Sequence, residues 1–343
     1  MASHRRPKQQ SRARVTVLTT AAAAAVVLSA NAANAAPSQK LSKDQVKAKV
    51  DELYSQAEQA TEKYDGAQAK QEKLQKEIST IQDNVARGQQ DLNKLRDSLG
   101  SLATSQYRTG GIDPSVQLFL SSNPDDFLDK ASTLDQLSAQ QVDALKKIQD
   151  KQRELAQERA EATAKLKDLS ATRAQLAQNK KDVQGKLSDA QQLLNTLTAK
   201  ERQQLAADQQ RADRSSSERV HLGTSKGSGM AGAAFSAAQS VIGSPYVYGA
   251  SGPSSFDCSG LTSWAYAQAG VSIPRTSQEQ ATIGTRITSV NDLQVGDLVF
   301  FYGDIHHVGL YAGNNMVLHA PHTGAVVRYE SMSDMPFQFG VRV

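Results

Sequence analysis

The sequence predicts two bodies of different fold class, an all-α coiled-coil hairpin followed by a compact α+β domain. Apolar residues recur at heptad spacing through much of the first two thirds of the chain, which predicts long paired helices. Serines and glycines then gather in residues 214–230, a composition typical of a flexible linker. Most of the aromatic residues and the only tryptophan, Trp264, lie beyond this linker. The remaining residues, 231–343, are numerous enough for one compact domain.

Residues 1–35 have the pattern of a signal peptide. Five basic residues precede an apolar stretch over residues 15–28, and Ala33-Asn34-Ala35 offers a small-x-small cleavage site. We therefore expect a secreted protein whose mature chain starts near Ala36. An uncleaved membrane anchor is the alternative, although the apolar stretch is short for a span.

The leader also accounts for the basic charge of the chain. The whole sequence has 39 Lys and Arg against 35 Asp and Glu. Five of those basic residues lie in the leader, so 34 remain against 35 acidic residues. Neither half carries a basic patch interleaved with aromatic residues, the pattern expected of nucleic-acid binding. We expect no nucleic-acid partner.

The first predicted helix runs from Leu41 to about Leu99 without a proline. Its apolar residues step by four and three, and only Gln71 and Gly88 interrupt the series: Val46, Val50, Leu53, Ala57, Ala60, Tyr64, Ala67, Leu74, Ile78, Ile81, Val85, Leu92, Leu95 and Leu99. A heptad repeat of this kind predicts packing against a partner along one seam.

The second predicted helix runs from about Leu134 to Leu205. One seam position is apolar throughout, in Ile148, Leu155, Ala162, Leu169, Leu176, Val183, Ala190 and Leu197. The alternate position is mixed and includes Gln152, Arg159, Arg173 and Lys180. The seam is therefore weak, which favours packing that can open or exchange partners.

A break at Gly110–Pro114 separates the two helices. Two small apolar pieces, Val116–Leu120 and Pro124–Leu128, are expected to cap the tip. We thus predict an antiparallel coiled-coil domain over residues 36–213, with a tip insertion near 100–133. A parallel dimer and a simple spacer are the alternatives.

The last domain is predicted to mix helices and strands. Helices are expected over residues 231–241 and from Cys258 to Gly270, and four strands over 297–301, 307–311, 316–320 and 326–329. Gly313-Asn314 indicates a hairpin turn. A turn centred there places His307 opposite His319 or its neighbour.

Cys258 is the only cysteine, so it cannot form an internal disulfide. At a helix N-terminus the helix dipole favours a thiolate. A histidine on one strand could take the thiol proton while a second histidine fixes its tautomer. Taken alone, a free cysteine on a helix is more often a small buried apolar side chain.

Six short motifs in order resemble the NlpC/P60 cell-wall peptidases. They are Pro245–Gly249, Phe256–Leu261, Pro274–Ser277 with Gln280, Val295–Leu298, His307–Tyr311 and His319–Pro321. The resemblance covers roughly residues 231–343, with one departure at Ala250, where the family often has a second glycine. The helical half resembles, more loosely, the coiled coils that precede such domains in actinobacterial cell-wall hydrolases.

The resemblance implies a papain-like α+β fold and cleavage of peptidoglycan stem peptides between D-glutamate and the diamino acid. It implies Cys258 as nucleophile, with its backbone N–H in the oxyanion hole, His307 as general base and His319 as the residue that orients it. The implied cleft residues are Tyr246, Asp257, Ser259, Arg275 and Ser277, and no metal or cofactor is implied. Alternation along the strand turns His306 to the opposite face from His307. A zinc site on His319, His322 and Asp304 is an alternative that lacks a convincing ligand set.

The predicted function is that of a secreted, cell wall-associated cysteine endopeptidase. The coiled coil is expected to restrain or position the catalytic domain, and a membrane-bound division regulator is a second expected partner besides the stem peptides. Two other functions stay open. One is a non-catalytic peptidoglycan-binding scaffold, and the other is an amidase or acyltransferase that uses the same Cys–His site.

Overall fold

The computed structural model describes residues 40–108, 116, 120, 124–219 and 229–343. Residues 42–343 form one compact unit. The expected signal peptide, the Gly110–Pro114 break and the glycines of the linker at 223 and 227 lie outside the described residues. Within the described ranges, no helix is both long and apolar enough to cross a membrane.

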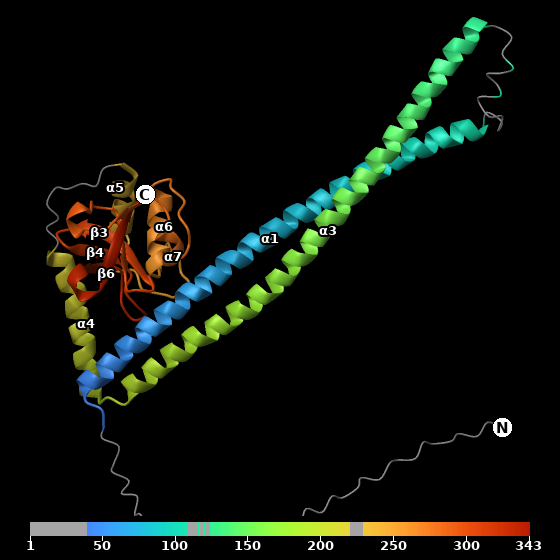
Figure 1. Cartoon of the computed structure of the whole chain (residues 1–343). Coiled ribbons are helices and arrows are strands. Elements are labelled where there is room, and N and C mark those ends of the chain that lie inside the picture. Colours follow the sequence, from blue (N-terminus) through green and yellow to red (C-terminus); the bar gives the residue numbers. More distant parts are fainter. Residues whose placement is uncertain (1–39, 109–115, 117–119, 121–123, 220–228) are drawn as a thin grey trace, which may run out of the picture. The chain divides into compact units, whose positions relative to one another are not determined.

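Two long helices, α1 (Lys43–Arg108) and α3 (Pro124–Asn195), pack against each other (Figure 1). Leu74 and Ile78 of α1 contact Leu169 of α3, whereas Leu92, later in α1, contacts the earlier Leu155. The helices are therefore antiparallel. All the buried aliphatic residues and alanines of α1 belong to the predicted heptad series.

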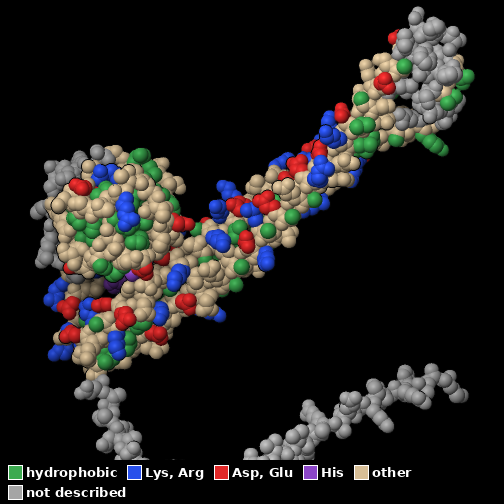
Figure 2. Space-filling model, viewed as in Figure 1, with side chains coloured by type: hydrophobic (Ala, Val, Ile, Leu, Met, Phe, Trp, Pro, Cys, Tyr) green, Lys and Arg blue, Asp and Glu red, His purple; other side chains and the backbone are tan. Residues whose placement is uncertain are grey.

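Gly88, which interrupts that series, lies at the contact between the two helices. A Cβ atom at this position would approach Leu155 Cδ2 to 2.7 Å. The glycine therefore allows α3 to come close. Elsewhere the seam is incomplete, as expected, because Leu145 and Leu166 are 48% and 49% exposed. Figure 2 shows basic and acidic side chains interspersed along these helices.

The second helix ends ten residues earlier than predicted. It stops at Asn195, and a separate helix, α4 (Ala199–Arg219), follows. The cause is a capping box: Thr198 N–H donates to the Glu201 carboxylate at 2.7 Å, and Glu201 N–H donates to Thr198 Oγ1 at 3.3 Å. The apolar heptad positions continue through residues 196–198, so the heptad pattern gave no sign that the helix ends there.

One segment expected in the flexible linker is helical, and the second long helix begins about ten residues earlier than predicted. Residues 214–217, expected in the flexible linker, belong to the end of α4. Residues 124–128, expected to cap the tip, form the start of α3 with Pro124 as its first residue, a position that suits proline. The polar composition of the first segment was thus misread as linker.

The C-terminal domain contains one six-stranded sheet in the order β1-β6-β2-β3-β4-β5, with every neighbouring pair antiparallel. The four predicted strands are present as β2 (Leu298–Phe301), β3 (His307–Gly313), β4 (Met316–His319) and β5 (Arg328–Ser331). The prediction missed β1 (Thr285–Ile287) and β6 (Phe337–Arg342). Because β6 pairs with β2, the missed strand lies inside the sheet.

Three helices accompany the sheet: α5 (Gly229–Gln239), α6 (Cys258–Gln268) and the short α7 (Ser277–Gln280). Short 3-10 helices span Val290–Asp292 and Met332–Asp334. Residues of α5 and α6 form one buried cluster with Leu298, Phe300 and Val308 of the sheet. A second cluster contains Val299 and Phe301, whose side chains alternate with those of the first. Both clusters consist entirely of C-terminal residues, so this domain has its own hydrophobic core.

The β3–β4 turn is shifted by one residue from its predicted centre. Asn314 and Asn315 both have left-handed φ values, 52° and 59°, and Leu310 pairs with Leu318. Asparagine tolerates this conformation, and two such residues form the tight turn. The shift places His319 beside Gly309, and His307 becomes its diagonal neighbour on the same face.

Candidate active site

Cys258 is the first residue of α6 and is completely buried. Asp257 caps the helix, because its carboxylate accepts a hydrogen bond from Gly260 N–H at 2.7 Å. Gly260 is required here, since an added Cβ would lie 2.1 Å from the Ala250 carbonyl oxygen. The cap and this close approach fix the direction in which the thiol leaves the helix N-terminus.

Two histidines on adjacent strands form a hydrogen-bonded pair. His307 Nε2 and His319 Nδ1 are 2.7 Å apart, and His319 Nε2 lies 3.2 Å from a Glu330 oxygen. Arg328 donates to the same Glu330 oxygen at 2.7 Å. Burial lowers the pKa of His319 to about 4, so this ring is neutral and can hold His307 in one tautomer. Glu330 is not among the site residues predicted from the sequence.

Gly309 provides the space for this pair. A Cβ atom there would approach Val317 Cγ2 to 2.4 Å and His319 Cβ to 3.0 Å. The glycine therefore makes room for the neighbouring strand and for His319.

We expect Gly309→Ala to destabilise the C-terminal domain by about 1–3 kcal/mol, because the added methyl group overpacks a buried site. Urea unfolding of residues 229–343 would measure the change. Gly303→Ala is the matched control, since nothing lies within 4 Å of its added Cβ. Equal stability of the two variants would contradict the assigned role of Gly309.

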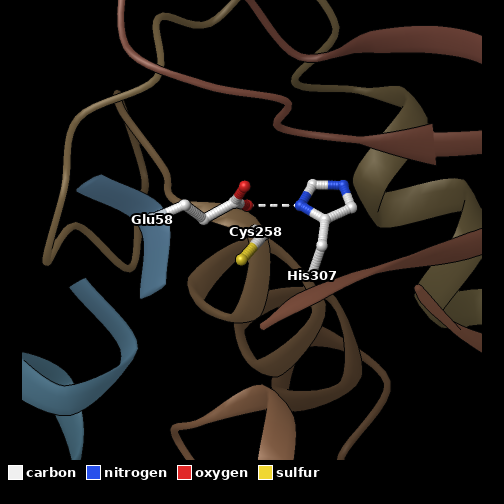
Figure 3. Close-up of side chains that lie close together, drawn as sticks. All are labelled: Glu58, Cys258 and His307. Carbon is white, nitrogen blue, oxygen red and sulfur yellow. Dashed lines mark hydrogen bonds and ion pairs between the residues drawn. The ribbon is translucent and has the colours of Figure 1, made fainter. Parts of the chain in front are cut away.

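Helix α1 inserts acidic side chains at the cysteine. Glu62 accepts hydrogen bonds from Ser259 Oγ at 2.6 Å, from Cys258 Sγ at 3.4 Å and from Ser277 N–H at 2.7 Å. Glu58 pairs with Nδ1 of His307 (Figure 3). Cys258 thus hydrogen-bonds Glu62 instead of His307. The Nδ1 atom of His307 is engaged by Glu58 and is not free to accept the thiol proton.

Arg275 joins α1 to the N-terminus of α6 through two carboxylates. Its guanidinium forms hydrogen bonds of 3.0 and 2.6 Å with the two oxygens of Asp257 and lies 3.2 Å from Asp65 of α1. It also donates to Ser259 Oγ at 2.9 Å. Burial raises the pKa of Asp65, and the nearby Asp257 carboxylate raises it further.

In this arrangement the cysteine is kept as a thiol. Burial raises the pKa of Cys258 well above its ordinary value, and the Glu62 and Glu58 carboxylates add to the effect. Burial, together with the Asp257 charge, raises the pKa of Glu62 to about 7. Burial acts to lower the pKa of His307, but the Glu58 carboxylate outweighs it and the pKa is raised. The thiolate expected from the helix dipole is therefore suppressed while α1 is in place.

Comparison with known proteins agrees with these motifs. The family model described as NlpC/P60 family matches residues 243–340. The C-terminal domain belongs to the NlpC/P60 family. This match includes Cys258, both histidines of the pair and Arg275, and it leaves the long helices outside.

Two curated relatives of the NlpC/P60 domain are named probable endopeptidases. The protein from Corynebacterium glutamicum is 54% identical over 106 residues, covering 31% of this chain and 50% of the relative. One from Mycobacterium tuberculosis is 42% identical over 96 residues, covering 28% and 25%. The chain thus spans half or less of the length of these relatives. Among solved structures, the NlpC/p60 domain of peptidoglycan hydrolase SagA is 35% identical, covering 33% of this chain and 98% of that one, with a TM-score of 0.32.

Four of the predicted cleft residues meet around the cysteine, in part through Glu62 of α1. Asp257, Ser259, Arg275 and Ser277 contact one another or the same Glu62 carboxylate around the cysteine. Tyr246 is 5% exposed, and burial followed by the Glu58 charge raises its pKa.

The other histidines lie at the margin of the site. His306 Nε2 is 3.3 Å from Ser55 Oγ of α1, and its Nδ1 pairs with Asp304. The His322 ring stacks on Tyr54, and its Nδ1–H donates to the Thr323 carbonyl. Among the described residues, the side chains that could share a metal ion are Glu58, Cys258 and His307, so His319, His322 and Asp304 do not form the zinc site that was the alternative interpretation.

The acidic residues of α1 were missed by the sequence analysis, although a signal was present. Glu58, Glu62 and Asp65 follow one another at spacings of four and three, and no basic residue stands three or four positions from any of them. Like charges at such spacing destabilise an isolated helix. An unpaired acidic stripe therefore indicates a partner outside the helix, here Arg275 and His307.

Proposed function

We propose that this protein is a secreted, cell wall-associated cysteine endopeptidase that hydrolyses peptidoglycan stem peptides, and that its N-terminal helices control the activity. The observation that carries the proposal is the arrangement of Cys258 at the start of α6 beside the His307–His319 pair. A thiol at a helix N-terminus with an oriented imidazole nearby is the arrangement that nucleophilic catalysis needs. The relatives named probable endopeptidases support the same reaction class.

The reaction begins when α1 has withdrawn its carboxylates. His307 Nδ1 takes the Cys258 proton, and the thiolate attacks the scissile carbonyl carbon. The backbone N–H of Cys258 stabilises the oxyanion. Protonated His307 then gives its proton to the leaving amine, and a thioester remains on the cysteine. Water, deprotonated by His307, hydrolyses this thioester, which releases the acid product and restores the thiol.

The contacts of Glu62 support a substrate with a free carboxylate next to the scissile bond. Ser259 Oγ and Ser277 N–H both donate to this carboxylate, and Arg275 lies beside them. A D-glutamyl residue linked through its side chain has a free α-carboxylate that these donors can bind. We therefore propose the bond between D-glutamate and the diamino acid as the scissile bond.

Control by the helices rests on the contacts of Glu58, Glu62 and Asp65. These carboxylates occupy the histidine nitrogen, the thiol and the proposed carboxylate donors at the same time. A substrate cannot bind while they remain. The partner that withdraws α1 is proposed to be a membrane-bound division regulator that binds the long helices.

Incubating residues 229–343 with isolated peptidoglycan tests the reaction, with fragments identified by mass spectrometry. This segment contains its own hydrophobic core. We expect soluble fragments ending in D-glutamate, and no release by the Cys258→Ala variant. Release of whole stems would show an amidase instead, and wall binding without release would favour the scaffold function.

A second prediction concerns thiol reactivity. In the full chain Cys258 is completely buried and hydrogen-bonds Glu62, so iodoacetamide should alkylate it at least about tenfold more slowly than in residues 229–343, where its pKa is no longer raised by α1. Timed labelling followed by mass spectrometry measures both rates. Equal rates would argue that α1 does not cover the thiol in solution.

A further inference from the structure

Three side chains of the kinds that bind zinc meet at the cysteine from three separate elements (Figure 3). They are Glu58 of α1, Cys258 of α6 and His307 of β3, all buried, and their candidate ligand atoms lie within 4.8 Å of one another. Zinc binds thiolate, imidazole and carboxylate at about 2.0–2.3 Å. Tetrahedral coordination at these lengths separates ligand atoms by roughly 3.3–3.8 Å. Small side-chain shifts would therefore bring all three onto one ion.

The surroundings of His307 fit this use of the ring. Its Nδ1 faces Glu58, while its Nε2 hydrogen-bonds His319 Nδ1 at 2.7 Å. Zinc-bound histidines commonly donate their second N–H to an acceptor that fixes the tautomer. His319, held in turn by Glu330, is that acceptor. Glu62, whose oxygen lies 3.4 Å from Cys258 Sγ, is placed to provide a fourth ligand.

The charge of the site also favours a cation. Four acidic side chains meet at the start of α6, and Arg275 pairs with two of them, Asp257 and Asp65. Glu58 and Glu62 are 6% and 3% exposed. Neither pairs with Arg275; Glu58 contacts His307, and Glu62 contacts the Cys258 thiol. Buried carboxylates are costly unless paired, and a divalent ion would pair with both.

An ion can reach the site through an adjoining cavity. The cavity has a volume of about 440 Å³, and its lining includes Glu58, His307, His319 and Glu330. The same cavity is lined by Lys47 and Asp51 of the more exposed start of α1. The two ligands Glu58 and His307 are thus accessible from a space large enough for a hydrated ion.

We propose that Zn²⁺ binds Glu58, Cys258 and His307 and locks α1 onto the NlpC/P60 domain in an inactive state. The inference rests on the proposed control of the enzyme by α1. On binding, the thiol proton and the proton shared by His307 and Glu58 are released to solvent, and the ion takes their place. The site is inhibitory, because the ion occupies both the nucleophile and the base.

Cobalt titration of the metal-free full chain, without substrate, tests the site. We expect one equivalent of Co²⁺ to give a thiolate-to-metal charge-transfer band and the visible bands of tetrahedral cobalt, and Zn²⁺ to remove both. Glu58→Gln should weaken binding at least about tenfold, comparable to known losses from perturbed zinc sites. Cys258→Ser should abolish the charge-transfer band. Glu72→Gln, an exposed position on the same helix, should change nothing.

Three results would overturn the proposal: no charge-transfer band in the full chain, unchanged affinity in Glu58→Gln, or equally tight binding by residues 229–343. The peptidase assay on residues 229–343 is independent of this titration. A chain that cleaves but does not bind cobalt would refute only the zinc site. If the full chain binds cobalt but residues 229–343 release no fragments, only the peptidase is refuted.

Discussion

Glu62→Arg in the full chain should raise the rate of peptidoglycan cleavage by about 100-fold or more. The Glu62 carboxylate accepts from Ser259, Cys258 and Ser277, and Arg275 lies 2.9 Å from Ser259. A guanidinium at this position would be a buried cation that faces hydrogen-bond donors and the positively charged Arg275. Such an unpaired buried charge costs about 3–5 kcal/mol, which at 1.4 kcal/mol per tenfold change favours release of α1 by two orders of magnitude or more.

The measurement is the rate at which soluble fragments appear, compared with that of residues 229–343. Glu72→Arg makes the same charge change at an exposed position of α1 and should leave the rate of the full chain unaltered. If Glu62→Arg is no faster than the unaltered chain, while residues 229–343 are active, contacts other than this carboxylate maintain the inhibition.

His307→Ala in residues 229–343 should reduce kcat by about 10³-fold or more, the size of effect seen when one member of a catalytic triad is removed. Among the described residues, the imidazole that contacts it is that of His319, which is held by Glu330 and whose pKa is lowered by burial. It therefore cannot take over as the base.

The neighbouring His306 provides the matched control. Its ring stacks on Tyr302, and its Nδ1 pairs with Asp304. His306→Ala should change kcat by less than about fivefold, a small effect beside the loss of a triad member. Comparable losses in both variants would show that the assignment of the base to His307 is wrong. Circular dichroism of both variants would confirm that the fold is retained.

Local patterns predicted most of the NlpC/P60 domain. The helix at Cys258, the four strands from Leu298 to Ser331 and the meeting of two histidines all follow from spacing and turn residues. The strand β6 was missed although it is longer than β2, because its partners β1 and β2 are distant in sequence. Register was wrong by one residue because the turn depends on which two residues adopt left-handed φ values, Asn314 and Asn315.

The contacts that Glu58, Glu62 and Asp65 of α1 make with the NlpC/P60 domain could not be predicted in the same way. Glu58 and Glu62 contact residues about 200 to 250 positions later in the chain. Local sequence patterns do not identify partners at that separation. The heptad repeat is defined by apolar side chains, and it gives no information about the charged positions between them. The unpaired negative charge of these residues is visible in the sequence. Only the fold shows that Arg275, Ser259 and His307 are their partners.

The position of the acidic stripe on one continuous helix has a consequence for how activity is switched. Glu58, Glu62 and Asp65 lie on α1, an uninterrupted helix of 66 residues whose buried aliphatic residues also pack on α3. Neighbouring residues of an α-helix are separated by about 100° around the axis. A modest rotation of α1 would withdraw all three carboxylates together, and none can leave alone without a buried charge staying behind. Release of α1 from the NlpC/P60 domain should therefore be cooperative. Each molecule should be either fully inactive or fully active, without intermediate rates.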